Sequence, residues 1–392
     1  MKKIAHGQIS KYLNENNLIF VNQSGFRESY STDTALTFLS ERILNNMDKG
    51  LYSGAIVIDL KKAFDTVDHT ILLDKFQAMG ACPTVFDWLS SYLDNREQFV
   101  KVGKGTSTSL NIKCGVPQGS ILGPLLFTIY VNDMYSSVDC DLFLYADDSF
   151  LFSCNKEIKL LQDTLCRNMH SLGIWLNENK LTLHPSKCKS ILFNTKRKLR
   201  KNNNLEIKYN DILFKQCTEV DYLGVKLDQD FSGNSILKHV VGKINGSLKF
   251  LYRKANFLDF NSRKLLANAL LQPHFDYACN AWFFGLTKTQ KSKLQTLQNK
   301  IVRFVLGLGN RAHLDLHHFE SVKMLKVEDR VNYLALNKIY DINHFLAPSY
   351  MYEFFKKISE IHSHNTRHSY GFFIRPVNTY GKKTFSYNGA KL

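Results

Sequence analysis

The spacing of apolar side chains changes along the chain between a helical period and a strand-like one. In the first fifty residues, apolar side chains recur at steps of three and four, as at Leu36, Leu39 and Ile43, which predicts helices. Residues 55–58 instead form a short, continuous apolar run that stops at Asp59, which predicts a buried strand. We therefore expect a fold that mixes helices and strands, with a carboxylate where the first strand ends.

Four segments in the middle of the chain continue this mixture. Residues 66–94 have helical spacing, and residues 99–112 alternate loosely between apolar and polar types, which predicts a hairpin. Residues 125–131 are apolar on nearly all sides, so we expect a buried helix with Pro124 in or near its first turn. Residues 142–152 form two β-rich runs around a very short polar turn, which predicts a second hairpin.

The second half of the chain is expected to be mostly helical. A helix to about residue 172 is followed by strands near 189–193 and 220–227. Between these strands lies the basic segment 196–201, for which a solvated loop, a nucleic-acid contact and a nuclear-import signal are alternative interpretations. From about residue 233 the spacing is helical, and one apolar stripe consists of Ile236, Val240, Ile244, Leu248 and Leu251.

Composition and charge narrow the class of protein. The 392 residues are 44% hydrophobic and carry a formal net charge of +16, spread along the chain rather than gathered in one tail. Such a surface attracts polyanions, so nucleic acid is favoured as a partner over an anionic membrane. The eight cysteines form no C-x-x-C pair, and the sequence contains neither a signal-peptide core nor an apolar run of 18 residues. We expect an intracellular protein, neither secreted nor membrane-embedded, without a choice between nucleus and cytoplasm.

Two adjacent carboxylates, Asp147 and Asp148, stand inside apolar runs with no basic neighbour. A pair of aspartates in a tight turn is by itself only a good turn former. Asp59 changes this interpretation, because three acids would meet if the strand that ends at Asp59 lies beside the hairpin. Mg²⁺ binds through one or two carboxylates together with water and substrate phosphates, and a pair of such ions serves in-line displacement at phosphorus. The acids therefore indicate phosphoryl or nucleotidyl transfer.

These acids belong to a series of short motifs along the chain. The motifs are Gln23-Ser24-Gly25-Phe26-Arg27 with Ser31-Thr32, Ile58-Asp59-Leu60-Lys61-Lys62-Ala63-Phe64-Asp65, Gly115-Val116-Pro117-Gln118-Gly119-Ser120 with Leu122-Gly123-Pro124-Leu125-Leu126-Phe127, Tyr145-Ala146-Asp147-Asp148, Leu183-His184-Pro185-Ser186-Lys187-Cys188, and Tyr222-Leu223-Gly224-Val225. In kind and in order, they resemble the motifs of a known family, the reverse transcriptases of non-LTR (LINE-like, jockey-type) retrotransposons. The resemblance extends over roughly residues 1–390.

The resemblance implies an α+β fold with the right-hand architecture of polymerases. Residues 1–228 would form the palm with a partial fingers region, residues 229–310 a helical, thumb-like domain, and residues 311–392 a C-terminal helical and irregular extension. The family's Arg-Pro-Ile motif upstream of Gly-Phe-Arg does not occur here. We therefore expect a truncated, internal piece of a longer element protein.

The resemblance also implies an RNA-directed DNA polymerase that adds deoxynucleotides to the 3′-hydroxyl of a DNA primer on an RNA template. Asp59, Asp147 and Asp148 would be the catalytic acids and the ligands of two Mg²⁺ ions, for which Mn²⁺ can substitute. Lys187 would be a further catalytic residue, as a general acid for the pyrophosphate leaving group.

Nucleotide and template contacts are expected from five residues. Phe64 stands at the position of a steric gate, where a ring against the sugar rejects a 2′-hydroxyl, and core packing is its alternative role. Gln118 and Gly119, on a Gly/Pro loop, would contact the incoming nucleotide and the template, although a plain surface glutamine is the alternative. Tyr145 would lie next to the primer end, and Arg27 would contribute to nucleotide and template binding.

Tyr222, Leu223 and Gly224 would belong to a hairpin that holds the primer, and lysines of the helices after residue 233 would follow the duplex backbone without reading bases. Two other functions stay open. One is a decayed or domesticated remnant that binds RNA or DNA through its basic surface without catalysis. The other is a Mg²⁺-dependent nuclease built on the same acids, which would leave Gln118 and Phe64 without a role.

Overall fold

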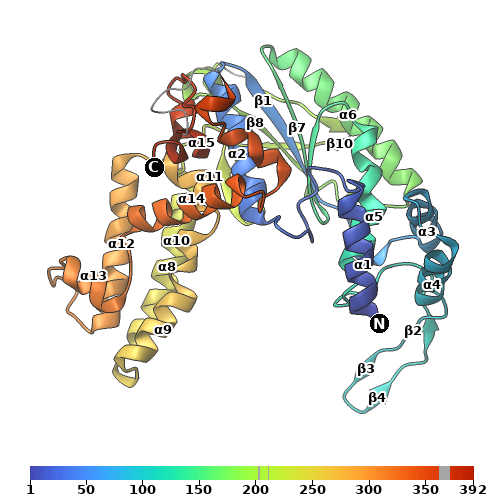
Figure 1. Cartoon of the computed structure of the whole chain (residues 1–392), viewed down its shortest axis with the longest axis horizontal. Helices are drawn as coiled ribbons and strands as arrows, with labels where there is room; N and C mark the ends of the chain where they lie inside the picture. The colour runs from blue at the N-terminus through green and yellow to red at the C-terminus, as the bar shows by residue number, and fades with distance from the viewer. Residues whose placement is uncertain (202–203, 211, 362–370) are drawn as a thin grey trace.

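A five-stranded sheet lies at the centre of the molecule (Figure 1). Its strands have the order β11-β8-β1-β7-β6. The structure, a computed structural model, describes residues 1–201, 204–210, 212–361 and 371–392. Neighbouring strands pair antiparallel, except that β11 runs parallel to β8. The strands are β1 (Tyr52–Ile58), β6 (Asp141–Tyr145), β7 (Asp148–Asn155), β8 (Lys189–Phe193) and β11 (Lys215–Cys217).

The alternation of side chains along the strands gives this sheet two apolar faces. On β7, Phe150 and Phe152 pack in one core cluster with helix α2 (Thr32–Asp48). Leu151, between them, packs in a second cluster with helix α6 (Ile158–Glu178). Because a strand's side chains point alternately to opposite faces, both faces are covered. Both faces of the sheet are therefore mainly apolar.

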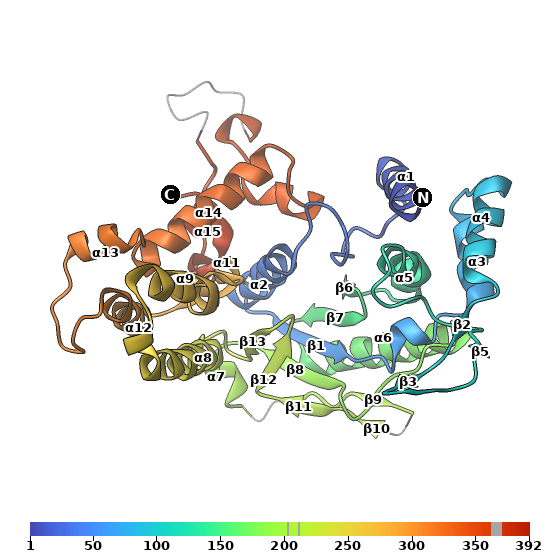
Figure 2. The ribbon, with the colours of Figure 1, turned by 90° about the horizontal axis from the view of Figure 1, so that it is seen from below.

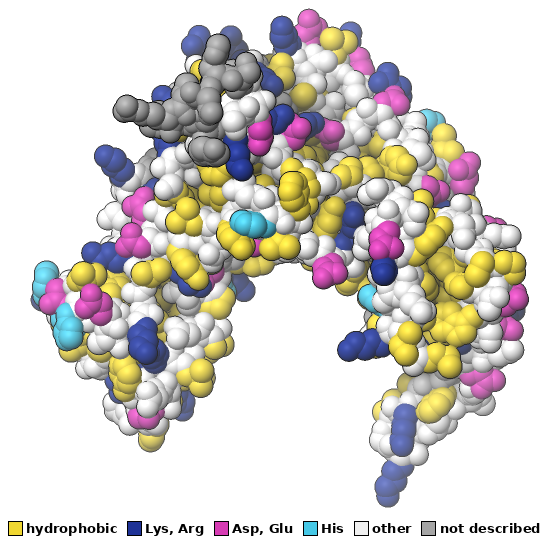
Figure 3. Space-filling model, in the orientation of Figure 1, with side chains coloured by type: hydrophobic (Ala, Val, Ile, Leu, Met, Phe, Trp, Pro, Cys, Tyr) yellow, Lys and Arg dark blue, Asp and Glu magenta, His cyan; other side chains and the backbone are white. Residues whose placement is uncertain are grey.

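Two limbs extend from the sheet and give the molecule the shape of an arch with a hollow between them (Figures 1 and 3). One limb contains α8 (Asn234–Arg253), α9 (Phe260–Leu270), α12 (Lys288–Leu306) and α13 (Leu316–Val322). The other contains α1 (Lys2–Glu15), α3 (His69–Ala78), α4 (Pro83–Leu93), α5 (Gly123–Val131), and the short strands β2 (Glu97–Gln98), β3 (Lys101–Val102), β4 (Gly105–Thr106) and β5 (Leu110–Asn111).

Described residues after α13 return to helix α2. Helix α15 (Phe385–Gly389) packs against α2, as does α11 (Cys279–Trp282), and Lys338 on α14 (Val327–Asn343) pairs with Asp33 on α2 at 3.3 Å (Figure 2). The short helix α10 (Pro273–Asp276) packs against α14 and α8. The buried carboxylate of Glu41 on α2 accepts hydrogen bonds from the backbone N–H and the hydroxyl of Ser386, and burial raises the pKa of Glu41. The C-terminal region is therefore part of the packing that supports the sheet.

The structure confirms several elements expected from the sequence. The hairpin over residues 142–152 is β6 and β7, and the hairpin over 99–112 is formed by β2 to β5. Residues 125–131 lie in α5, with Pro124 in its first turn, and the apolar stripe of α8 is buried. Within the described ranges, no helix has the length and apolar character needed to cross a membrane.

Several elements expected from the apolar pattern differ in the structure. The helix expected over residues 66–94 is two helices, α3 and α4, because Gly80 has a φ of +91° and Pro83 starts a new helix. The basic segment expected as a loop begins with a short helix, α7 (Lys196–Leu199), which Thr195 caps at Lys198 N. The helix expected to end near residue 172 continues to the end of α6.

The apolar pattern predicted one strand over residues 220–227, whereas the resemblance placed Tyr222, Leu223 and Gly224 in a hairpin, and the structure has a hairpin there. Strands β12 (Glu219–Tyr222) and β13 (Val225–Asp228) pair antiparallel around Leu223 and Gly224, whose φ values are +47° and +76°. Positive φ at both central residues is the geometry of the tightest hairpin turn. A further two-stranded pair, β9 (Lys208–Tyr209) and β10 (Ile212–Leu213), precedes it.

Candidate functional site

The three expected acids lie at one end of the central sheet. β1 pairs antiparallel with β7, and the last pair of the register is Ile58 with Ser149. Asp59 therefore follows the end of β1 beside the start of β7 at Asp148, and Asp147 stands in the turn that joins β7 to β6. Alternation along the strands places Asp59 and Asp148 on the same face of the sheet. This end of the sheet is directed towards the hollow between the two limbs (Figure 1).

The negative charges of these acids act on one another. The pKa of Asp148 is raised to about 6, first by enclosure in the protein and then by the negative charges of Asp147 and Asp59. Among the described residues, Lys187 forms an ion pair with one of these acids, since its Nζ lies 3.7 Å from Asp59 Oδ1 with both side chains well exposed. An exposed pair of this kind contributes little stability. The site therefore keeps an excess of negative charge.

The donor set suits a divalent ion that brings part of its own coordination. Among the described residues, no three His, Cys, Asp or Glu side chains form a group that could hold a metal ion by themselves. Mg²⁺ needs only one or two protein carboxylates when water and substrate phosphates supply the rest. Asp59 has a side chain that is 40% exposed, and neither it nor Asp147 is buried. The carboxylates thus fit Mg²⁺ that arrives with a phosphate substrate.

Lys187 reaches this end of the sheet because its segment is hydrogen-bonded along the residues that follow β1. The backbone N–H of Lys61 donates to Thr182 O at 2.8 Å, and the backbone N–H of His184 donates to Asp59 O at 2.8 Å. Cys188 is buried next to the same carbonyl. The segment therefore fixes both the backbone of Asp59 and the place of Lys187.

Gln118 and Gly119 lie on a loop that is held against the same region. Its backbone is fixed by the N–H of Val116, which donates to Phe64 O at 2.8 Å. The side chain of Gln118 donates from Nε2 to Asp65 Oδ1 at 2.8 Å and is exposed. Gly119 is also exposed and has a φ of +78°. The structure therefore brings the loop to the segment that carries Asp59 and Phe64.

Phe64 lies between the core and the surface. Its ring stacks on the fully buried ring of Phe127 with 4.3 Å between centroids, and the exposed ring of Phe26 approaches its edge at 6.3 Å. Phe64 itself is half-buried. Both of its expected roles, core packing and a contact with a substrate, are compatible with this position.

The expected primer hairpin lies on the same side of the sheet. The ring of Tyr222 is buried against Phe150 at 4.8 Å, and burial followed by the charge of Asp148 raises the pKa of Tyr222. The carbonyl of Leu223 accepts a hydrogen bond from the hydroxyl of Tyr277 at 2.6 Å. Tyr222 therefore anchors the hairpin in the core, while in the turn Leu223 is half-buried and Gly224 is exposed.

Tyr145 and Arg27 occupy different surroundings. Tyr145 is half-buried at the end of β6, and its pKa is raised by burial and then by Tyr277. The Arg27 guanidinium donates from Nη1 to the carbonyls of Phe20 and Gln23 at 3.0 and 3.1 Å. Burial lowers the pKa of Arg27. This geometry gives Arg27 a role in holding its own segment, and its contact with nucleotide or template stays a prediction.

Three residues near the site received no role from the sequence motifs. Gln23, Ser24 and Gly25 lie along the outer edge of β6, where Ser24 N donates to Leu144 O at 2.8 Å. The Gln23 side chain is fully buried and its Oε1 accepts from the backbone N–H groups of Gly25 and Ala146 at 2.9 and 3.2 Å. The motif that contains these residues and the strand β6 were both visible in the sequence, but their position side by side was not.

Replacing Gly25 with alanine is expected to destabilise the fold by about 2–3 kcal/mol. A Cβ on Gly25 would overlap the backbone nitrogen of Ala146 and lie 3.1 Å from the carbonyl carbon of Tyr145, so the turn would have to shift. The matched control is Gly7→Ala in α1, where a Cβ meets nothing within 4 Å and should stabilise the helix by up to about 1 kcal/mol. Urea unfolding of both variants measures the difference, and equal effects would contradict the close packing at Gly25.

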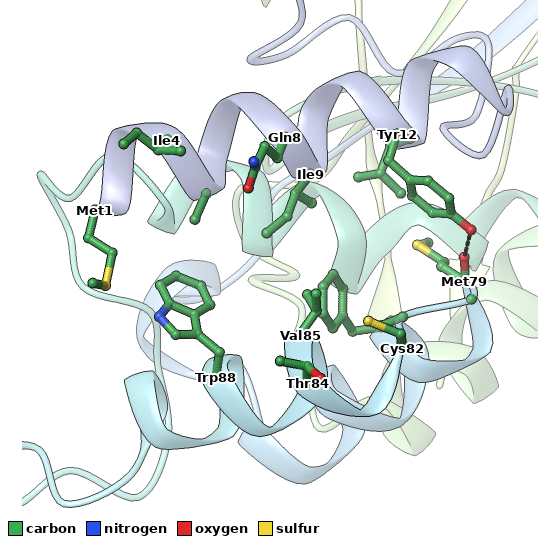
Figure 4. A pocket seen from close by; sticks show the side chains of 15 residues that line it. Met1, Ile4, Gln8, Ile9, Tyr12, Met79, Cys82, Thr84, Val85 and Trp88 are labelled. Carbon is green, nitrogen blue, oxygen red and sulfur yellow. Dashed lines mark hydrogen bonds between the residues drawn. The ribbon is translucent and has the colours of Figure 1, made fainter.

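A separate apolar cavity lies away from the acids. It has a volume of about 630 Å³ and lies between α1 and α4, with Ile9, Val85 and Trp88 in its lining (Figure 4). The hydroxyl of Tyr12 donates to Met79 O at 3.0 Å at its side. None of the described residues that line it is an expected site residue. The candidate chemistry is therefore at the end of the sheet and not in this cavity.

Comparison with known proteins identifies the class. The family model described as reverse transcriptase (RNA-dependent DNA polymerase) matches residues 1–227, which is more than half of the chain. The chain therefore belongs to the reverse transcriptase family, and the resemblance found in the motifs is confirmed.

The curated relatives come from transposable elements. The chain is 26% identical over 342 residues to the probable RNA-directed DNA polymerase from transposon BS of Drosophila melanogaster, a match that covers 82% of this chain and 37% of the relative. It is 27% identical over 327 residues to the probable RNA-directed DNA polymerase from transposon X-element of the same species, covering 79% and 34%. The RNA-directed DNA polymerase from mobile element jockey of Drosophila funebris is 26% identical over 296 residues, covering 73% and 32%.

The chain thus spans about a third of the length of the curated relatives that it matches. Among solved structures, it is similar to an apo telomerase from Candida Tropicalis truncated from the C-terminal domain, with a TM-score of 0.40 and 16% identity over 58% of this chain and 44% of the other. At that TM-score the likeness is too weak to define the architecture of this chain.

Proposed function

We propose that this chain is the polymerase core of a non-LTR retrotransposon protein and that it extends a DNA primer on an RNA template. The observation that carries the proposal is the register between β1 and β7, which brings Asp59 next to Asp147 and Asp148. Membership in the reverse transcriptase family supports the same reaction. In this proposal, residues 1–228 act as palm and partial fingers, residues 229–310 as the thumb, and residues 311–392 as an extension.

Each side chain of the site has a part in the proposed reaction. Asp59 and Asp147, with Asp148 beside them, hold two Mg²⁺ ions or Mn²⁺ in their place. When bound, such ions make the attacking oxygen more nucleophilic and stabilise charge on the leaving oxygen. Lys187, 3.7 Å from Asp59, is close enough to the acids to give a proton to the departing pyrophosphate.

The remaining residues bind and orient the substrates. Phe64 packs against the sugar, and Gln118 on its exposed loop contacts the nucleotide and template. The turn at Leu223 and Gly224 supports the primer, since Gly224 is exposed while Tyr222 is buried. Cations of the helical limb follow the duplex backbone through the charge of its phosphates.

The test is primer extension with the purified chain, an RNA template, a DNA primer, deoxynucleotides and Mg²⁺. The expected result is a DNA product whose length is set by the RNA template, with Mn²⁺ supporting the same product. The alternative of a non-catalytic remnant predicts no product, together with RNA binding that weakens steeply as salt rises, because the net charge of +16 would act through counterion release. Binding of that kind without extension would contradict the proposed activity.

A further inference from the structure

The hydroxyl of Tyr350 enters the site region from the C-terminal part of the chain. Tyr350 lies 326 residues from Ser24 along the sequence, yet its hydroxyl is 3.1 Å from Ser24 Oγ and 3.3 Å from Thr34 Oγ1. Burial raises the pKa of Tyr350 to about 12, so the phenol stays protonated at neutral pH. Its ring is stacked on Phe38 with 4.5 Å between centroids. The residue is therefore fixed by its ring and bonded through its hydroxyl.

The direction of these hydrogen bonds follows from counting protons. The Thr34 hydroxyl donates its one proton to Ser31 O at 2.9 Å. In the hydrogen bond between Thr34 and Tyr350, the Tyr350 hydroxyl must therefore be the donor and Thr34 Oγ1 the acceptor. The phenolic proton of Tyr350 is then used, and its oxygen accepts the proton of the Ser24 hydroxyl. Ser24 is buried, so its hydroxyl would lose this acceptor without access to water if Tyr350 lacked its oxygen.

Ser24 belongs to residues 22–25, called here the edge segment, which covers the outer side of β6. β6 is the last strand of the sheet, so its outer backbone groups need partners. Ser24 N donates to Leu144 O at 2.8 Å, and Leu144 N donates to Asn22 O at 3.0 Å. The side-chain Oε1 of Gln23 also accepts a hydrogen bond, at 3.2 Å, from the backbone N–H of Ala146, the residue directly before Asp147. The edge segment therefore holds the turn that carries the acids.

This turn needs such support because it has an unfavourable backbone. Ala146 has a φ of +56°, in the left-handed region that a residue with a Cβ adopts at a cost. A strained backbone conformation persists only where contacts with the surrounding structure hold it in place. Here the surroundings are the Gln23 side chain and the backbone of Gly25, which packs directly on Ala146.

We propose that Tyr350 is a positioning residue for the acid turn, residues 145–148, and that it acts by fixing the edge segment through Ser24. The expected effect on the rate of primer extension rests on the proposed function. The expected effect on the backbone of the acid turn rests on geometry alone. It also gives the C-terminal region a task in the reaction, although no residue after 310 belongs to the motifs that define the site. Tyr350 touches no substrate in this proposal.

The structural consequence is tested by hydrogen–deuterium exchange of the purified full chain, which requires no activity. Tyr350→Phe keeps the ring on Phe38 and removes only the oxygen, so the fold should persist while the edge segment loosens. Exchange in a peptide covering residues 142–148 should become several-fold faster, because the amides of Leu144 and Ala146 bond to the edge segment. The control is Tyr352→Phe, whose hydroxyl donates to Phe345 O at 3.3 Å. Unchanged exchange in Tyr350→Phe would overturn the proposal.

The kinetic consequence is tested by steady-state primer extension. Tyr350→Phe is expected to lower kcat by about tenfold, because small displacements of reacting groups are costly, while KM for the deoxynucleotide stays the same. Ser24→Ala should have the same effect, and the double variant should be no worse than either single one. Additive losses, or a loss in KM alone, would contradict positioning through Ser24.

The proposed function and the positioning role of Tyr350 can be refuted independently. If the wild-type chain extends no primer, the proposed function fails, and the exchange experiment still decides whether Tyr350 fixes the turn. If the wild type is active and Tyr350→Phe has normal kcat and normal exchange, the positioning role fails and the proposed function stands. A drop in thermal stability without a change in kcat or exchange would assign Tyr350 to packing only, against the inference.

Discussion

Asparagine in place of Asp147 is expected to lower the rate of RNA-templated primer extension on the order of a thousandfold, which corresponds to about 4 kcal/mol of transition-state stabilisation. The reason is the loss of one negative charge from a group whose members act on one another, as the raised pKa of Asp148 shows. An amide keeps the shape of the carboxyl group but is a poor ligand for Mg²⁺. Folding should be unaffected, because Asp147 stands in a turn and is not buried.

The measurement is extension of a labelled primer by wild type and variant at equal concentration, in Mg²⁺ and separately in Mn²⁺. Asp139→Asn is the matched control, since it makes the same chemical change on a side chain that is 81% exposed and pairs only loosely with Arg167 at 3.9 Å. Circular dichroism melting checks that both variants fold. Extension by Asp147→Asn at the wild-type rate would refute the catalytic role of the acids.

The part of this site that could be predicted from the sequence is the part built from local patterns. The apolar run before Asp59 predicted a strand, and the two β-rich runs around Asp147 predicted a hairpin, because both depend on the spacing of neighbouring residues. Both elements exist in the structure. The sequence did not establish that the strand pairs with the hairpin. The structure shows this pairing in the register of β1 with β7.

What the sequence pattern missed depends on contacts between distant residues or on backbone conformation. The turn at Leu223 and Gly224 was taken for part of a strand, because leucine fits an apolar run and rarely adopts a positive φ. Gln23 and Tyr350 carried no signal of their role, since their partners Ala146 and Ser24 are 123 and 326 residues away. Only the tertiary structure brings these groups to the turn.

Valine in place of Phe64 is expected to raise the use of ribonucleotides relative to deoxynucleotides by about tenfold to a hundredfold. Phe64 is half-buried, with its ring stacked on the buried Phe127 at 4.3 Å and with its segment joined to the loop of Gln118. A ring fixed from behind in this way cannot move aside for a 2′-hydroxyl, whereas a valine is shorter and leaves space. The ratio of kcat/KM for the two nucleotide types, measured on one RNA template, reports the change.

The alternative role of Phe64, core packing, makes a different prediction. It requires Phe64→Val to cost about 1–3 kcal/mol of stability, as for other large-to-small changes, and to leave the nucleotide ratio unchanged. Phe76→Val is the matched control, because Phe76 lies in the same core cluster, is only 4% exposed and lines the cavity beneath α1 instead of the site. Both variants should lose stability, so stability alone does not distinguish the roles. Only a ratio that changes in Phe64→Val and not in Phe76→Val assigns the ring to the sugar, and equal ratios in both would return Phe64 to the core.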